Sequence, residues 1–185
     1  MQLPENCYDE KILDVIKGYN PSQVGVVDFS CLKFEEKIRE FCKQNSCGRY
    51  GKSWVCPPGC GSVKELEAEC KKYSNAIIFN IVKELKDSFD WDGMMEGGRV
   101  LSELINNINE ALKNNGFADY RLFGSSSCND CEECTYPDRP CKFQEKLFTP
   151  IEACGINVME TAQKAGLDYM NGQDTVTFFG MLFYN

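Results

Sequence analysis

The chain has 185 residues, a formal net charge of −8 at pH 7, 12 cysteines and no histidine. A chain of this length buries roughly 70% of its unfolded surface on folding, so it does not need disulfides for stability. The absence of histidine excludes a Ser-His or Cys-His nucleophile pair, a histidine-ligated catalytic zinc and a Rieske centre. The negative charge disfavours a general nucleic-acid binder, because phosphate binding relies on concentrated Lys and Arg, and it favours partners with a basic docking surface.

The first ten residues contain no basic segment followed by an apolar one, so we expect no export signal. We therefore expect the protein in the reducing cytoplasm, where clustered cysteines bind metals or carry out redox chemistry more often than they form disulfides. The apolar runs at 76–82 and 176–184 are shorter than the roughly 18 residues of a membrane helix. We expect a soluble protein without membrane contact.

The first predicted element in chain order is a short amphipathic helix at 34–42. Its apolar residues recur at helical spacing, and Cys42 lies at its carboxyl end. The loop that follows, at 43–61, is rich in glycine and proline. Glycine lets the backbone approach a bulky inorganic centre closely, and proline fixes the path of the chain. The loop is therefore a candidate for wrapping a metal centre.

A second helix is predicted at 63–73, directly after this loop. Ser62 and Glu65 form an S-x-x-E capping box, and apolar residues follow on one helical face. The amino end of this helix would direct N–H groups and partial positive charge toward the preceding loop. Such a helix end favours a net-negative thiolate centre in the loop.

A strand, a helix and a second strand are predicted at 76–82, 100–112 and 120–123. Gly97-Gly98-Arg99 precedes the helix and allows either a loop that carries a cation or the first helical turn. A strand-helix-strand order predicts a right-handed crossover between parallel strands. The cysteines that begin at Cys128 would then lie beyond the carboxyl end of the second strand, where open α/β sheets place their sites.

Two short helices at 150–154 and 158–165 and a final strand at 176–184 complete the predicted elements. No linker, repeat or low-complexity segment interrupts the chain, so we expect a single iron-sulfur-binding domain at 1–185. The expected fold class is α/β (or α+β), with a small mixed sheet, flanking helices and two cysteine-rich cluster-binding loops.

Eight of the cysteines fall into two quartets, which predict two metal centres. The first quartet, C-x4-C-x8-C-P-P-x-C, is Cys42, Cys47, Cys56 and Cys60, and the second, C-x2-C-x2-C-x6-C, is Cys128, Cys131, Cys134 and Cys141. Four thiolates can hold one tetrahedral zinc or one [4Fe-4S] cluster. The second quartet has the spacing of a ferredoxin, whereas the first would suit a zinc knuckle nearly as well. Cys141 is an open assignment, since the fourth cysteine of a bacterial ferredoxin run binds the other cluster.

The segments 45–60 (NSCGRYGKSWVCPPGC) and 149–158 (TPIEACGINV), together with the second quartet, resemble the family of predicted metal-binding proteins called domain of unknown function 2284. The resemblance spans roughly residues 30–180. It implies an iron-sulfur protein of a kind common in anaerobic bacteria and archaea, and it implies no reaction. The chain departs from the usual pattern at Ile151 and Cys154, and neither residue is among the eight proposed ligands.

Four cysteines lie outside the quartets: Cys7, Cys31, Cys70 and Cys154. Free cysteine is commonly a small buried apolar residue, and this is the interpretation that we favour for Cys70 and Cys154. Cys154 is also a candidate substitute ligand or redox partner of a cluster.

The sequence supports three hypotheses about function, and it assigns no catalytic residue. The leading one is a cytoplasmic protein with two [4Fe-4S] clusters that exchanges single electrons with a redox protein partner. The second is a cluster-dependent reductase that acts on a small substrate, because 185 residues provide more scaffold than two clusters require. The third is a zinc-stabilised interaction module without redox activity.

Overall fold

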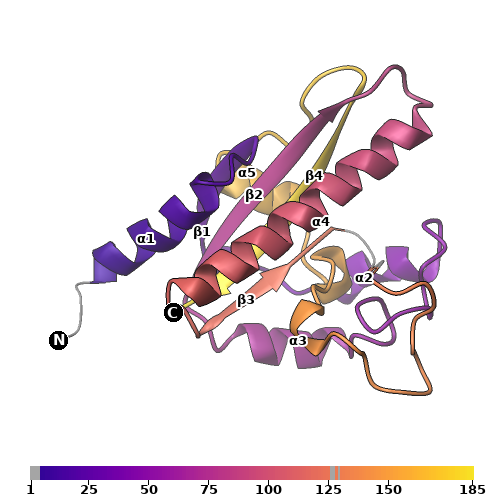
Figure 1. Cartoon of the computed structure of the whole chain (residues 1–185), viewed down its shortest axis with the longest axis horizontal. Helices are drawn as coiled ribbons and strands as arrows, with labels where there is room; N and C mark the ends of the chain where they lie inside the picture. The colour runs from indigo at the N-terminus through magenta and orange to yellow at the C-terminus, as the bar shows by residue number, and fades with distance from the viewer. Residues whose placement is uncertain (1–4, 126–127, 129) are drawn as a thin grey trace.

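A four-stranded antiparallel sheet forms the centre of the computed structural model, which describes residues 5–125, 128 and 130–185. The sheet has the order β1-β2-β4-β3, with β1 at Gln23–Asp28, β2 at Asn75–Glu84, β4 at Thr175–Tyr184 and β3 at Tyr120–Phe123 (Figure 1). All three neighbouring pairs are antiparallel. The combination of this sheet with several helices confirms the predicted α/β (or α+β) fold class. The prediction of a mixed sheet is wrong, because the last strand pairs between the two parallel strands and makes every neighbouring pair antiparallel.

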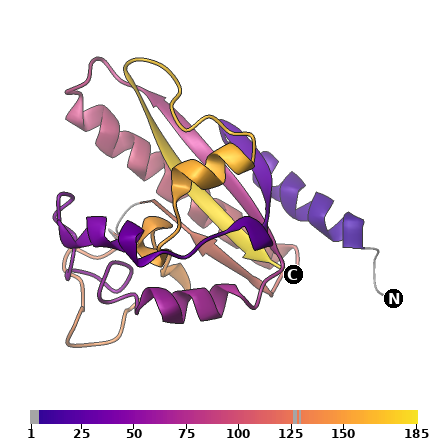
Figure 2. The same cartoon turned by 180° about the vertical axis from the view of Figure 1, so that it is seen from behind.

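The helices cover both faces of the sheet (Figures 1 and 2). They are α1 at Glu5–Lys17, α2 at Glu36–Lys43, α3 at Val63–Cys70, α4 at Trp91–Asn114 and α5 at Val158–Lys164, with 3-10 turns η1 at Phe29–Cys31, η2 at Gln144–Lys146 and η3 at Glu152–Cys154. In β2, Ile77 and Phe79 pack in the core cluster of α1 and α4, whereas Ile78 packs in the cluster of α3, α5 and η3. Successive side chains point to opposite faces of a strand, so burial of both faces explains the continuous apolar run of β2.

The predicted parallel orientation of the two strands that the crossover connects is confirmed. β2 and β3 each pair antiparallel with β4, so they run parallel to one another with β4 between them. The final strand therefore separates the two strands that α4 connects. Its central position explains why β4 is almost entirely apolar.

α4 begins about nine residues before the predicted start at 100. Asp90 caps the helix through a hydrogen bond from the Gly93 amide (3.0 Å), and Gly97-Gly98-Arg99 lies inside the helix. A Cβ on Gly97 would lie 2.6 Å from the Phe178 ring, so the close approach of α4 to β4 requires glycine there. Tertiary packing outweighs the low helix propensity of this pair of glycines.

Sequence patterns did not predict α1 and β1. In α1, Ile12 and Ile16 are fully buried against α4, but they stand among charged residues. β1 is short and contains Gly25, where a Cβ would lie 2.5 Å from the Leu167 side chain. α3 ends at Cys70, three residues before the predicted end, and the chain then turns into β2. Among the described residues, no helix combines the length and the apolar character needed to cross a bilayer.

Candidate metal centre

The first quartet lies where α2 ends and a loop without regular secondary structure follows. Cys42 is the penultimate residue of α2, and the other three cysteines lie between α2 and α3. Gly48 and Gly51 have φ values of +70°, which glycine adopts at no steric cost. The Gly51 amide donates to the Pro57 carbonyl (2.8 Å) and so folds the loop back on itself. The capping box of Ser62 and Glu65 forms as predicted and starts α3 directly after the loop.

The thiols of the first quartet influence one another. Burial raises the pKa of the Cys42 thiol, and the nearby Glu152 carboxylate and the Cys47 and Cys56 thiols raise it further. Burial also raises the pKa of Cys60, where the effect of Arg39 opposes that of Cys56. Burial and mutual repulsion both disfavour free thiolates, and a bound cation reverses this balance.

Two buried polar side chains flank this quartet. Arg39 is only 6% exposed; its Nη2 donates to the Gly61 carbonyl (2.5 Å) and to Cys60 Sγ (3.4 Å), whereas its buried Nη1 has no partner among the described residues. The Ser53 hydroxyl is buried and has no hydrogen bond of ordinary length among the described residues. Burial raises the pKa of the Cys56 thiol, and the nearby Ser53 hydroxyl partly offsets this rise. Both groups are donors directed at sulfur.

The second quartet lines a single pocket. Its wall consists of Ser53, Trp54, Val55, Cys128, Cys131, Cys134, Thr135, Cys141, Phe143 and Leu147. The structure thus brings Cys141 together with the other three cysteines, the assignment that the spacing left open. The free volume is about 20 Å³, so a body larger than a single ion or water requires the side chains to turn outward.

Hydrogen bonds already involve two of these four thiols. Cys128 Sγ donates to Asp130 Oδ2 (3.0 Å), and Cys141 Sγ accepts from the Phe143 amide (3.4 Å). Burial raises the pKa of Cys128 to about 12. The Asp130 backbone lowers this pKa, whereas the Asp130 carboxylate raises it. A free thiolate is therefore unfavourable at Cys128 unless a cation accompanies it.

The two cysteine loops pack against each other. Trp54, from the first loop, donates through Nε1 to Thr135 Oγ1 (3.3 Å) and to the Arg139 carbonyl (3.1 Å) of the second. The Trp54 and Tyr136 rings meet edge to face, with centroids 5.0 Å apart. A Cβ on Gly59 would lie 2.9 Å from the Tyr136 ring, so this contact also requires glycine. In Figures 1 and 2 both loops lie at the same end of the sheet.

Within the described chain, no three cysteine or acidic side chains converge closely enough to hold a metal ion as they stand. The residues nevertheless fit a thiolate-bound centre, because each site combines four cysteines with donors that face sulfur. The unpartnered Nη1 of Arg39 is the clearest sign, since a buried charged donor without an acceptor is energetically unfavourable.

The cysteines outside the quartets occupy different environments. Cys70 and Cys154 are fully buried, which confirms the interpretation of both as core residues, and Cys31 is exposed. Burial raises the pKa of Cys154 well above its usual value, so this thiol is unreactive as it stands. Cys7 lies in α1, and its side chain is outside the described part.

Sequence reasoning did not single out Arg39, Ser53, Asp130 or Glu152. Arg39 had one available signal: it precedes Cys42 by three residues on a predicted helix and so lies on the same face. The other three become relevant only through contacts between distant segments, which spacing does not reveal.

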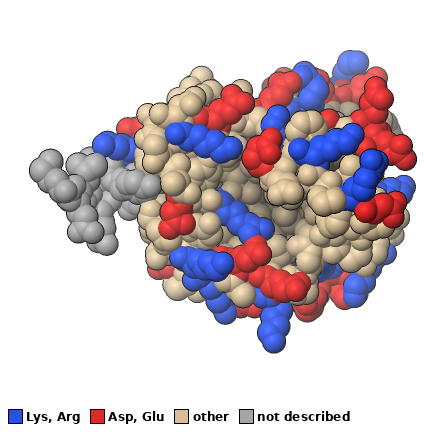
Figure 3. All heavy atoms as spheres, turned by 60° about the horizontal axis from the view of Figure 1, so that its bottom comes forward, with Lys and Arg blue, Asp and Glu red and all other residues tan. Residues whose placement is uncertain are grey.

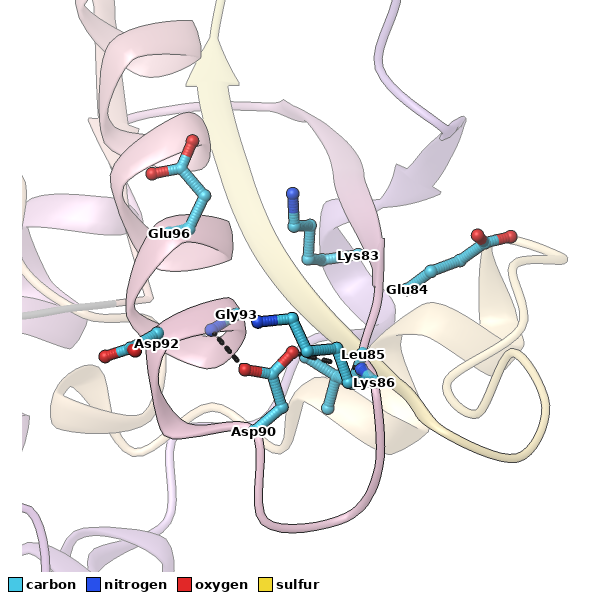
Figure 4. Close-up of a pocket in the computed structure, with 8 residues that line it drawn as sticks. All are labelled: Lys83, Glu84, Leu85, Lys86, Asp90, Asp92, Gly93 and Glu96. Atoms are coloured by element: carbon cyan, nitrogen blue, oxygen red, sulfur yellow. Dashed lines mark hydrogen bonds between the residues drawn. The ribbon is translucent and has the colours of Figure 1, made fainter.

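A cavity of about 470 Å³ lies elsewhere, between the end of β2 and the start of α4 (Figure 4). No cysteine lines it, and its lining mixes lysines with carboxylates. Asp90 already accepts from the Gly93 and Lys86 amides at this helix start.

Charge is mixed on the surface that Figure 3 displays. Lys and Arg are interspersed there with Asp and Glu. The net charge of −8 is thus not gathered into one patch on that face.

Residues 25–184 match the model of a family described as predicted metal-binding protein, domain of unknown function 2284. The match covers both quartets and confirms the resemblance noted from the sequence. Searches of the curated proteins and of the solved structures gave no match.

Proposed function

The chain belongs to the family of predicted metal-binding proteins, domain of unknown function 2284, and we propose that it binds two [4Fe-4S] clusters and transfers single electrons to and from a protein partner in the cytoplasm. The eight quartet cysteines would hold the clusters, four to each. Such a cluster, when bound, takes up and releases one electron at a time.

The shared wall between the two sites is the observation that carries this proposal. Ser53, Trp54 and Val55 lie between two cysteines of the first quartet, yet they line the pocket of the second. The Cys134 thiol also contributes to the raised pKa of Cys56, which is due mainly to burial. Two centres this close suit the passage of electrons between them, whereas two structural zinc sites would gain nothing from a common wall.

The residues around the sites favour electron transfer over acid–base catalysis. The chain has no histidine, the side chain that most often serves as a general acid or base. Trp54, Val55 and Phe143 line the second site, and apolar side chains beside a cluster tune its potential. The electron would come from a one-electron redox protein, and a basic docking surface on that protein would suit the net charge of −8.

Metal and sulfide analysis after anaerobic purification tests the proposal. We expect about eight iron atoms and eight acid-labile sulfides per chain. We also expect a visible absorption band that loses intensity when the protein is reduced. About two zinc ions per chain without sulfide would instead support the zinc-stabilised module and overturn the proposal. Purification must exclude air, because zinc can occupy thiolate sites from which iron has been lost.

A titration with a reductant then separates electron transfer from small-molecule reduction. We expect the reduced protein to reoxidise only with a protein or dye acceptor. Reoxidation that requires one small substrate, and that consumes this substrate over repeated cycles of reduction, would identify a reductase instead.

A further inference from the structure

Arg39 is buried beside the first quartet with half of its guanidinium unused. Nη2 donates to Cys60 Sγ (3.4 Å) and to the Gly61 carbonyl, and Nη1 is buried without a partner among the described residues. The side chain is 6% exposed, so water does not screen its charge. The charge of Arg39 acts on the Cys60 and Cys42 thiols, whose pKa values it lowers.

The hydrogen bonds described at the second quartet involve no cation. The charged group in contact with one of its thiols is the Asp130 carboxylate, 3.0 Å from Cys128 Sγ. The other hydrogen-bond partner of these thiols is neutral: the Phe143 amide donates to Cys141 Sγ. Asp130 is exposed, so solvent weakens its effect, but the sign remains negative.

We propose that Arg39 makes the cluster at the first quartet the more easily reduced of the two. The inference rests on the proposed function. Reduction adds one negative charge to a cluster, and a buried cation that donates to its sulfur atoms stabilises that charge. Asp130 disfavours the same change at the second site. An electron that enters through the second quartet therefore passes to the first and is held there, with Arg39 as a positioning residue that acts through sulfur.

A redox titration of the full chain, followed by EPR under anaerobic conditions, tests the inference. We expect two midpoint potentials in the wild type. Arg39→Met should lower the higher midpoint potential by about 59 mV, which corresponds to a tenfold change in the equilibrium constant for one-electron reduction. The lower potential should not change. Arg39→Lys keeps the charge but loses the planar fork, so its shift should be smaller.

Lys43→Met is the matched control. Lys43 is on the same helix and adjacent to Cys42, but its side chain is 55% exposed and pairs with Glu40. The same loss of charge at this position should leave both potentials unchanged. An equal shift in Lys43→Met, a fall of the lower potential in Arg39→Met, or no change at all would overturn the inference.

A measurement on the wild type covers the case in which the variants do not fold. Protein labelled with ¹⁵N only in arginine should give an arginine nitrogen coupling in the pulsed EPR spectrum of the reduced, higher-potential cluster. Absence of this coupling in the wild type would overturn the inference on its own. A protein that binds no iron would instead contradict the proposed function, so the two failures are distinguishable.

Discussion

The sheet with its helices and the two cysteine loops are held in different ways. In the sheet and helices, large side chains such as Phe79, Ile108 and Leu112 are completely buried and pack against one another. The cysteine loops contain few backbone hydrogen bonds, and the donor of Arg39 beside them has no partner among the described residues. Apolar burial is therefore sufficient to stabilise the sheet and its helices, whereas the stability of the cysteine loops depends on what their thiols bind.

Removal of the metal would test this difference most severely. We expect amide hydrogen exchange in 43–61 and 130–147 to approach the rate of unprotected amides after chelation, because local stability follows local contacts. Amides of β2, β4 and α4 should keep their protection, since buried apolar side chains on both faces of the sheet hold these elements together. Exchange that increases equally throughout the chain would show that the two regions form one cooperative unit.

Substitution of a single cysteine tests whether the loops depend on the quartet thiols. Cys56→Ala should remove about half of the bound iron and sulfide, because the first centre would lose one of its four thiolates. The control is Cys31→Ala, at an exposed cysteine of η1 outside both quartets, which should leave the metal content unchanged. Equal iron in both variants would contradict the assignment of the first quartet.

Truncation of a core side chain should have the reverse effect. Phe79 is fully buried in β2, so Phe79→Ala should destabilise the protein by about 3–5 kcal/mol, measured by urea denaturation, without changing the iron content of the folded fraction. Val26, on the edge strand β1, is 55% exposed, and Val26→Ala should change stability by less than about 0.5 kcal/mol. Loss of iron from folded Phe79→Ala would show that the core and the loops are coupled.

Two adjacent glycines in α4 provide the smallest and most precise test of the sheet-and-helix region. Gly97→Ala places a Cβ 2.6 Å from the Phe178 ring and should destabilise by about 1–3 kcal/mol. At Gly98 the nearest such atom is 3.7 Å away, so Gly98→Ala should stabilise the helix by about 0.5–1 kcal/mol. Thermal unfolding of both variants checks the opposite signs, and the same sign in both would contradict the packing of α4 on β4.

Local patterns predicted much of the fold and little of the surroundings of the site. The capping box of Ser62, the apolar run of β2 and the crossover through α4 depend on neighbouring residues, and each could be predicted. The insertion of β4 between β2 and β3 depends on strand pairing between distant segments, which periodicity does not encode. The same holds for the contact of Trp54 with Thr135, which are 81 residues apart. Cysteine spacing predicted two quartets, and the fold places the four cysteines of the second around one pocket.

The EPR spectrum of the fully reduced, anaerobically purified protein tests the central claim most directly, because it reports both the identity of the centres and their proximity. We expect two spins per chain, with signals broadened and split by magnetic interaction between clusters that share the wall of Ser53, Trp54 and Val55. Two independent, unsplit signals, or a protein without an iron signal, would contradict the account.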